Sequence, residues 1–173
     1  MLFRSLAEAG IDLPTQAGHA LPDSTWVARR LCAFEWVLCA APAYLAQAAP
    51  LQAPDDLAGH QWLSHEQGAE GLPLTLQAAG GARATVRVMP RVVSNNLLTV
   101  AQMCSAGLGL AALSRPEVED ELRSGRLLAV LPGWRLEPMP VWAVTPQRAR
   151  PAKVRQALEA LGTALRALPG AQE

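Results

Sequence analysis

One stretch of the chain, from Arg91 to Leu113, constrains the fold more than any other. It begins with a β-branched run, Arg91-Val92-Val93, and ends with a second apolar run, Leu110–Leu113. Between them, apolar residues recur three and four positions apart, which places them on one face of a helix. These residues are Leu97, Val100, Ala101 and Cys104. Gly107 suits the end of such a helix. The stretch therefore predicts a strand–helix–strand unit with parallel strands, and so an α/β fold.

The rest of the chain alternates short apolar runs with helical patterns, as expected of such a fold. Strands are predicted at 26–31, 36–40, 127–131 and 141–144. The runs at 62–63, 74–77 and 85–89 are predicted as a small meander, with a turn at Gly80-Gly81. Helices are predicted at 42–47, 116–123 and 151–168, and the last carries an apolar stripe of Val154, Leu158, Leu161 and Leu165.

Charge and hydropathy exclude several classes of protein. The 15 Lys and Arg residues balance 15 Asp and Glu, and half of the residues are hydrophobic. Such a chain is neither a disordered tail nor a polybasic nucleic-acid binder. Arg29-Arg30 and the basic residues at 148–153 lack interleaved aromatics, so no direct DNA contact is expected. With no long apolar run and no signal-peptide pattern, we expect no membrane contact and a cytoplasmic location.

No arrangement of residues predicts catalysis, a metal site or a cofactor. The three cysteines lie too far apart for a Cys-X-X-Cys motif and are expected in the core. They are Cys32, Cys39 and Cys104. The histidines, His19, His60 and His65, fit no nucleophile or zinc motif and are expected in turns or on the surface. Ser124, in Arg123-Ser124-Gly125, is expected to end a helix rather than act as a nucleophile.

The residues Ser94-Asn95-Asn96 are the clearest candidate for binding. All three are good helix N-cap residues. The start of a helix that follows a parallel strand also offers free N–H groups and the positive end of the helix dipole, which suit a carboxylate or another small polar ligand. From these residues alone, simple helix capping is favoured over ligand binding.

Six segments of the chain resemble the effector-binding region of LysR-type transcriptional regulators. They occur in the order and at the spacing found in that family, and the resemblance extends from about Ser5 to Leu168. The segments are Leu21-Pro22-Asp23-Ser24, Val27-Ala28-Arg29-Arg30-Leu31, Val37-Leu38-Cys39-Ala40-Ala41-Pro42-Ala43-Tyr44-Leu45, Asp56-Leu57-Ala58-Gly59-His60, Ala106-Gly107-Leu108-Gly109-Leu110-Ala111, and Gly125-Arg126-Leu127 leading to Val130-Leu131-Pro132.

The resemblance implies a periplasmic-binding-protein-like (type 2) α/β fold, with two subdomains joined by crossing strands and a small-molecule cleft between them. In that family the turn similar to Ser94-Asn95-Asn96 contributes to the cleft, so ligand binding becomes the favoured interpretation. Ser94 would donate to a ligand carboxylate or hydroxyl, and Asn95 or Asn96 would add a polar contact. The segment similar to Cys39–Pro42 would lie near the same cleft, which adds Ala40, Ala41 and Pro42. Gln16 would approach from the opposite wall.

The sequence departs from the family in two ways. The winged helix-turn-helix, the linker helix and the first half of subdomain I have no counterpart in these residues. Also, the segment similar to the family's Asp-Leu-Ala-(Ile/Leu)-Arg strand reads Asp12-Leu13-Pro14-Thr15-Gln16, in which a proline interrupts the strand.

The first departure implies a regulator truncated at its N-terminus, with subdomain II complete and subdomain I largely missing. Its expected parts are a remnant of subdomain I with the first crossing segment at 1–31, the effector-binding subdomain II at 32–140, and the return strand and C-terminal helix of subdomain I at 141–173. That helix would lack a sheet to pack on. Its exposed stripe would then favour a dimer, other self-association or marginal stability.

The expected function is that of an effector-binding domain. It would bind a small anionic metabolite, such as a carboxylate, and control transcription through a DNA-binding domain that is absent from this sequence. The alternative is a free-standing small-molecule-binding or interaction module that pairs with full-length regulators and modulates them. A hydrolase is a third hypothesis, which the absence of a nucleophile motif disfavours.

Overall fold

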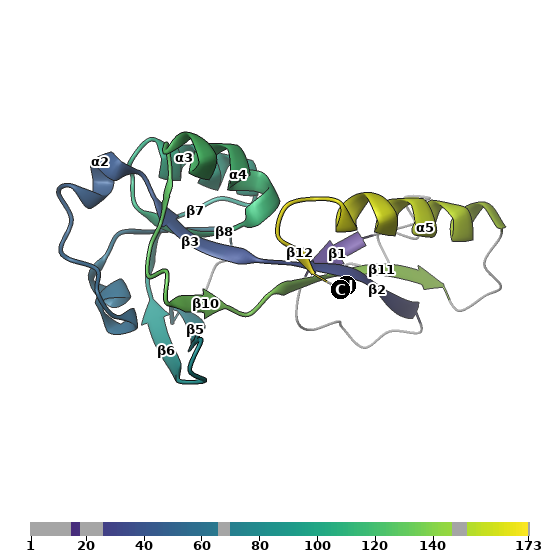
Figure 1. Cartoon of the computed structure of the whole chain (residues 1–173), viewed down its shortest axis with the longest axis horizontal. Coiled ribbons are helices and arrows are strands. Elements are labelled where there is room, and N and C mark those ends of the chain that lie inside the picture. The colour runs from purple at the N-terminus through teal and green to yellow at the C-terminus, as the bar shows by residue number, and fades with distance from the viewer. Residues whose placement is uncertain (1–14, 18–25, 66–69, 147–151, 173) are drawn as a thin grey trace. The chain divides into compact units, whose positions relative to one another are not determined.

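The computed structural model describes residues 15–17, 26–65, 70–146 and 152–172. The chain divides into two compact units, Met1–Phe34 with Pro138–Glu173, and Glu35–Glu137. No sheet is shared between the units (Figure 1). Each unit also has its own buried hydrophobic residues.

The Glu35–Glu137 unit is built on a five-stranded sheet with the strand order β7-β4-β8-β3-β9. Strand β4 (Trp62–Ser64) pairs in parallel with β7 (Pro90–Val93) and with β8 (Leu110–Ser114). β3 (Trp36–Ala40) runs antiparallel to β8, and β9 (Leu128–Ala129) runs antiparallel to β3. Helix α3 (Leu97–Ser105) connects β7 to β8. The predicted strand–helix–strand unit with parallel strands is confirmed, with β4 inserted between its two strands.

Strand β3 is buried on both faces of this sheet. Val37 and Cys39 belong to the core under α3 and α4 (Arg115–Ser124), whereas Leu38 and Ala40 belong to a second core on the opposite face. Successive strand residues point to opposite faces, so this alternation places the sheet between two cores. Burial on both faces also explains why β3 reads as a continuous apolar run.

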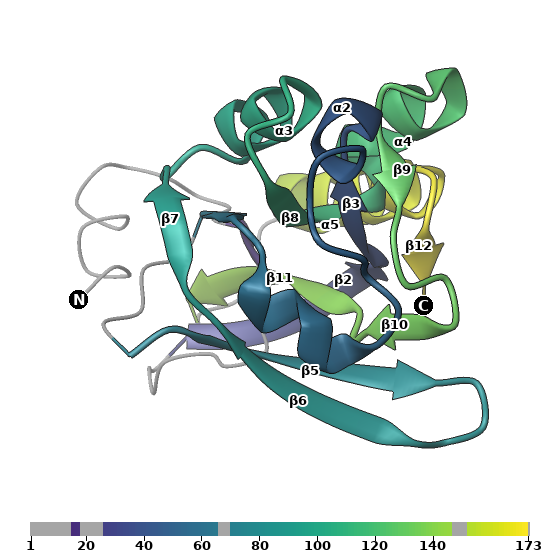
Figure 2. The same ribbon diagram turned by 90° about the vertical axis from the view of Figure 1, so that its left-hand side faces the viewer.

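A three-stranded antiparallel sheet covers the second core, on the side of the five-stranded sheet opposite to α3 and α4 (Figure 2). Its order is β10-β5-β6, formed by β10 (Trp134–Leu136), β5 (Leu72–Ala78) and β6 (Arg83–Val88). Helix α2 (Pro42–Leu45) and the 3-10 helix η1 (Pro54–Gly59) add residues to the same core. The β5–β6 turn includes Gly81, whose φ is +83°.

The predicted meander of 62–63, 74–77 and 85–89 is wrong in one strand. The β5–β6 hairpin forms as expected, but β4 belongs to the five-stranded sheet. Trp62 and Leu63 are each only 2% exposed, on opposite faces of that sheet. Two consecutive buried residues need a sheet that is covered on both sides, which a hairpin with one solvated face cannot provide.

Helices α3 and α4 each end just before a glycine with a left-handed backbone. Gly107 and Gly125 have φ angles of +81° and +74°, in the left-handed region that ends many helices. Ser124, the last residue of α4, donates its hydroxyl proton to the Glu121 carbonyl at 3.2 Å. The prediction that Ser124 ends a helix is confirmed.

The other unit contains a four-stranded antiparallel sheet with the order β1-β11-β2-β12. Its strands are β1 (Thr15–Ala17), β11 (Met139–Pro146), β2 (Trp26–Phe34) and β12 (Ala171–Gln172). Helix α5 (Ala152–Arg166) packs on this sheet through a core that contains Leu31, Ala143 and Leu158. Arg166 Nη1 donates to the Leu31 carbonyl at 2.9 Å.

The expectation that the C-terminal helix has no sheet to pack on is wrong. Leu158 is only 1% exposed, and the other three residues of the predicted stripe pack around the same core, half-buried. β2 is longer than predicted, and β12 adds a strand that the sequence pattern did not indicate. α5 covers β2 and β11 through Leu31 and Ala143, which lie within the predicted strands, and it also contacts β12. None of the helices in the described ranges is both long and apolar enough to cross a membrane.

Candidate functional site

The carboxyl ends of β4, β7 and β8 meet at one edge of the five-stranded sheet, because these strands are parallel. β3 runs the other way and begins at this edge, where Trp36 pairs with Ser114. We call this edge the carboxyl edge. It consists of Trp36, Ser64, His65, Ser94, Asn95, Asn96 and Ser114. In open α/β sheets, ligands bind beyond the carboxyl ends of the strands.

The loop from β7 into α3 is held by its own polar groups. Ser94 N–H donates to the Ser64 carbonyl at 3.0 Å, which joins the loop to the end of β4. Ser94 Oγ accepts from Asn96 N–H at 3.3 Å. Asn96 Oδ1 accepts from the N–H groups of Leu98 and Thr99 at 2.9 and 3.3 Å, so Asn96 is the N-cap of α3. Helix capping, the first of the two roles considered for these residues, is therefore present.

Capping decides what this loop can still offer to a ligand. The N–H groups of Asn96, Leu98 and Thr99 are already bonded within the chain, so a ligand cannot rely on a row of free helical N–H groups. The capping oxygens act as acceptors, which leaves the Ser94 hydroxyl proton and the Asn96 side-chain N–H groups as donors. Asn95 is exposed. The loop therefore favours a ligand that accepts hydrogen bonds.

Two aromatic side chains also lie at the carboxyl edge, and the sequence analysis did not identify them. The ring centroids of Trp36 and His65 are 5.2 Å apart, and the ring planes are tilted by 45°. Both residues are half-buried. Their positions, at the start of β3 and just after β4, become meaningful only when strand order and register are known.

Acidic residues near this edge are engaged by basic or hydroxyl groups. Arg115 Nε lies 3.0 Å from Glu119 Oε2, and Arg115 Nη1 lies 3.7 Å from Glu35 Oε2. Ser114 Oγ donates to Glu117 Oε2 at 2.6 Å. The Arg115 charge is thus shared between two carboxylates and offers little to an anionic ligand.

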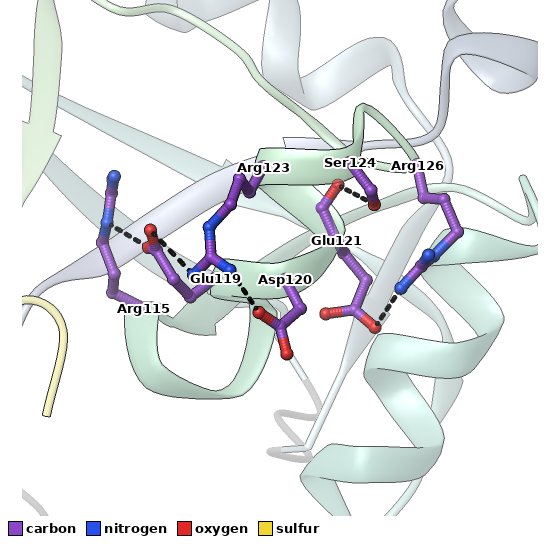
Figure 3. Close-up of polar contacts among 7 residues, drawn as sticks. All are labelled: Arg115, Glu119, Asp120, Glu121, Arg123, Ser124 and Arg126. Atoms are coloured by element: carbon purple, nitrogen blue, oxygen red, sulfur yellow. Dashed lines mark hydrogen bonds and ion pairs between the residues drawn. The ribbon is translucent and has the colours of Figure 1, made fainter.

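Ion pairs continue along the exposed side of α4, away from the carboxyl edge (Figure 3). Arg123 lies 3.0 Å from Asp120 and 3.9 Å from Glu119, and Arg126 lies 3.3 Å from Glu121. Arg123 and Asp120 are well exposed, so solvent weakens their attraction. This arrangement is a solvated helix face.

The structure does not bring Ala40, Ala41 and Pro42 together with Ser94-Asn95-Asn96. These three residues lie at the end of β3 and the start of α2, whereas the carboxyl edge is at the beginning of β3. Ala40 and Ala41 are buried in the two cores, at 0% and 3% exposed, and Pro42 is exposed. Gln16 belongs to the other unit, where it pairs with Trp142 in the β1–β11 ladder.

His60 lies in the bend between η1 and β4, in line with the turn position expected for it, but its side chain is buried. It is 8% exposed, and its Nδ1 lies 3.0 Å from the hydroxyl of Tyr44. That hydroxyl also accepts Gln61 N–H at 2.9 Å. Among the described residues Nε2 has no partner. His60 thus joins α2 to the start of β4. His19 lies outside the described residues.

The cysteines belong to the core, as expected. All three are buried and free. Cys104 Sγ donates to the Cys39 carbonyl at 3.4 Å and to the Gly109 carbonyl at 3.5 Å. The hydrogen bond with Cys104, together with burial, raises the pKa of the Cys39 thiol well above its usual range. Such a thiol is a poor nucleophile. The described part of the chain contains no cluster of three metal-ligating side chains.

A family model described as the LysR substrate binding domain matches residues 2–166. The chain is 36% identical over 160 residues to the HTH-type transcriptional regulator PtxR of Pseudomonas aeruginosa, covering 92% of this chain and 51% of that protein. It is 32% identical over 153 residues to the HTH-type transcriptional activator AaeR of Escherichia coli, covering 88% of this chain and 49% of that protein. The chain thus spans about half the length of these relatives.

Solved structures share the same fold. The regulatory domain of CrgA, a LysR-type transcriptional regulator from Neisseria meningitidis, superposes with a TM-score of 0.72 at 26% identity, covering 92% of this chain and 78% of that chain. The full-length virulence activator AphB of Vibrio cholerae gives a TM-score of 0.71 at 24% identity, covering 90% of this chain and 52% of that chain. The architecture is periplasmic-binding-protein-like, type 2. This chain therefore belongs to the LysR substrate-binding domain family.

Proposed function

We propose that a small anionic metabolite, such as a carboxylate, binds at the carboxyl edge of the five-stranded sheet and acts as the effector of a LysR-type regulator. The single observation that carries this proposal is the β7–α3 loop. Ser94 Oγ and Asn96 Oδ1 accept hydrogen bonds within the chain, whereas the Ser94 hydroxyl proton and the Asn96 amide protons remain as donors. The loop lies at the sheet edge where ligands of α/β proteins bind.

In this proposal each polar residue of the loop has a separate role. Ser94 donates its hydroxyl proton to the ligand carboxylate, and Asn95 adds a contact from its exposed side chain. Asn96 holds the start of α3 and keeps the positive end of the helix dipole near the ligand's charge. Gln16 remains a predicted contact from the other unit. Ala40, Ala41 and Pro42 lie at the opposite end of β3 and are not assigned to this site.

Ligand binding would control transcription through a DNA-binding part that the described residues do not supply. The named relatives are HTH-type regulators, and this chain covers about half of each. We infer that the regulator works in the cytoplasm, where its operator DNA lies. Self-association, or pairing with a full-length regulator, remains a prediction that size-exclusion chromatography tests directly.

Thermal unfolding with a panel of small carboxylates tests the proposal. A ligand that binds only the native state adds about 2.7 kcal/mol of stability at 100 times its dissociation constant, so a binder raises the Tm. Ser94→Ala should lose most of this ligand-induced rise, measured against its own ligand-free Tm. Ser124→Ala is the matched control, because its hydroxyl is used at the far end of α4. A rise of equal size in Ser94→Ala, or no rise with any carboxylate, would contradict the proposal.

A further inference from the structure

The three-stranded sheet β10-β5-β6 has one face toward a core and one face toward solvent (Figure 2). Leu76 and Val86 belong to that core, and successive strand residues point to opposite faces. The alternate residues therefore form the outer face, where they are exposed. Besides Pro73, these are Thr75, Gln77, Arg83, Thr85, Arg87 and Arg135. The outer face thus carries three arginines, and none of the three strands contains an acidic residue.

The strand register places two of these arginines on either side of Gln77. Arg135 of β10 and Arg83 of β6 are each paired directly with Gln77 of β5. Neighbouring strands lie about 4.8 Å apart, so the Cα atoms of the two arginines are about 10 Å apart on the same face. Charge-assisted hydrogen bonds are about 2.8 Å long, so two guanidinium groups at this spacing can both donate to one small anion above Gln77. The side-chain amide of Gln77 supplies a further donor.

Arg83 and Arg135 differ from the other arginines of the Glu35–Glu137 unit, because they have no partner among the described residues. Each of the others is held by an oxygen atom of the chain. Three pair with carboxylates and two donate to carbonyl oxygens; they are Arg115, Arg123 and Arg126, and Arg87 and Arg91. The two guanidinium groups that flank Gln77 therefore keep their donors for a ligand.

The charges around Gln77 are not balanced within the sheet. Cross-strand neighbours stabilise a sheet when their charges are opposite, but here two cations flank a neutral amide. Glu137, the first acidic residue after β10, already has an interaction of its own. Thr75 and Thr85 form the next pair along the hairpin, with their Oγ atoms 3.1 Å apart. Since one hydroxyl donates to the other, one hydroxyl proton stays available, so the surface offers both donors and positive charge to an anion.

Two guanidinium charges fit a dianionic phosphate group better than a carboxylate. A phosphate monoester carries about −1.5 to −2 charges at pH 7 and three acceptor oxygens. Guanidinium groups bind phosphate through pairs of parallel N–H···O bonds, whereas a carboxylate has one charge and two oxygens to share between two arginines. We propose that Arg83, Gln77 and Arg135 form a binding site for a phosphate group, either inorganic phosphate or a phosphate monoester. The site lies on a different sheet from the carboxyl edge and does not rest on the proposed function.

An NMR titration of the full chain tests the proposal. Inorganic phosphate, methyl phosphate and dimethyl phosphate are each added at constant ionic strength, with chloride as the reference anion, and the side-chain Nε–Hε signals of the arginines are recorded. The signals of Arg83 and Arg135 should move together and saturate with inorganic phosphate or methyl phosphate, and the tighter of these two identifies the source of the phosphate group. Dimethyl phosphate, which carries a single charge, should bind about two- to fivefold more weakly.

Three variants that each remove one positive charge locate the site. Arg83→Gln and Arg135→Gln should weaken phosphate binding about two- to fivefold, the range that exposed charge pairs contribute, and the double variant should show no saturable binding. Arg123→Gln is the matched control, because it changes the net charge equally at an exposed arginine of α4, outside the sheet. Its affinity for phosphate should equal that of the wild type.

Several outcomes would overturn the proposal. Equal weakening in all three variants, or equal shifts with dimethyl phosphate and chloride, would mean an adventitious ion only. Charged side chains on edge strands also prevent association between sheets, which needs no anion. Self-association of Arg83→Gln or Arg135→Gln with unchanged phosphate binding would assign the arginines to that role instead. Should a variant fail to fold, the wild type decides: methyl phosphate must bind more weakly as the pH falls through about 6, where its phosphate group takes up a proton, and an unchanged affinity would refute the site.

Discussion

At the scale of single residues, side chains at the start of α3 cap the helix, and in the proposed function they also meet the ligand. The side-chain oxygen of Asn96 accepts hydrogen bonds from two N–H groups of the helix, and the Ser94 hydroxyl oxygen accepts one from Asn96 N–H. From the sequence, capping and ligand binding were considered as alternatives. In the structure they are compatible, because a side chain that accepts hydrogen bonds from the helix N–H groups can still donate its own protons to a ligand.

Replacing Asn96 by alanine should therefore lower stability through loss of the cap. Two N–H groups of α3 would lose their acceptor, which costs about 1 kcal/mol for a typical N-cap. Asn95→Ala is the matched control, because Asn95 is exposed and is not the cap. Urea unfolding monitored by circular dichroism should show the loss only in Asn96→Ala. Equal midpoints for the two variants would refute the capping role.

Gly109 matters because the chain passes very close to it. A Cβ atom on Gly109 would lie 2.5 Å from the Gln61 carbonyl oxygen, which accepts Leu110 N–H at 2.8 Å. The two nearest atoms are backbone atoms of Gln61, which cannot move aside as the end of a flexible side chain can, so Gly109→Ala should destabilise the protein by about 1–3 kcal/mol. Gly59→Ala, where nothing lies within 4 Å of the added atom, should be close to wild type in the same unfolding experiment. A fully stable Gly109→Ala protein would show that β4 and β8 are not packed as described.

At the scale of elements, local patterns predicted helices and their ends well, and predicted sheet membership poorly. The spacing of Leu97, Val100 and Cys104 was sufficient to identify α3, because a helix is stabilised by contacts three and four residues apart. Gly107 and Gly125 marked helix ends because their left-handed conformation suits glycine. Strand pairing depends instead on residues far apart in the chain. β4 was therefore assigned to the wrong sheet, and the Trp36–His65 contact was not foreseen.

The 3-10 helix η1 provides a pH-dependent test at this scale. Asp56 Oδ2 accepts from Ala53 N–H and Gln52 N–H, both at 2.8 Å. These hydrogen bonds lower the pKa of Asp56 below its usual value. A lowered folded-state pKa means that the stabilisation is present above the unfolded pKa, about 3.9, and is lost as pH falls through the folded value.

Asp56→Ala should accordingly be less stable than wild type at neutral pH, with the difference shrinking below about pH 4. Asp55→Ala is the matched control on the same element, because the N–H groups of Gln52 and Ala53 donate to the carboxylate of Asp56 and not to that of Asp55. Thermal unfolding between pH 3 and pH 7 measures both variants. A difference for Asp56→Ala that stays constant over this range would contradict the assigned cause.

At the scale of the whole molecule, the chain has two units, each with its own core. Leu158 of α5 is buried with Leu31 and Ala143 in one unit, whereas the sheet of Glu35–Glu137 has cores on both faces. The resemblance to LysR-type regulators predicted the fold class. It did not predict the sheet that supports α5, because the pairing of β2 with β11 joins residues far apart in the chain, although both segments were predicted as strands.

Leu158→Ala should weaken one unit selectively. Removing a fully buried leucine side chain costs about 2–5 kcal/mol. Native-state hydrogen exchange should therefore show faster exchange for amides of β2 and β11, with amides of β3 and β8 changed much less. Equal acceleration in both sheets would mean that the two cores unfold as one.

The central claim is that the carboxyl edge of the five-stranded sheet binds the ligand, and NMR mapping tests it most directly. A carboxylate that raises the Tm is titrated into ¹⁵N-labelled protein, and amide shifts are compared at the two ends of β3. The largest shifts are expected at residues 36, 64–65, 94–97 and 114, with little change at residues 40–41 and 107–109. Shifts concentrated at residues 40–41 and 107–109, or spread evenly over the unit, would contradict the claim.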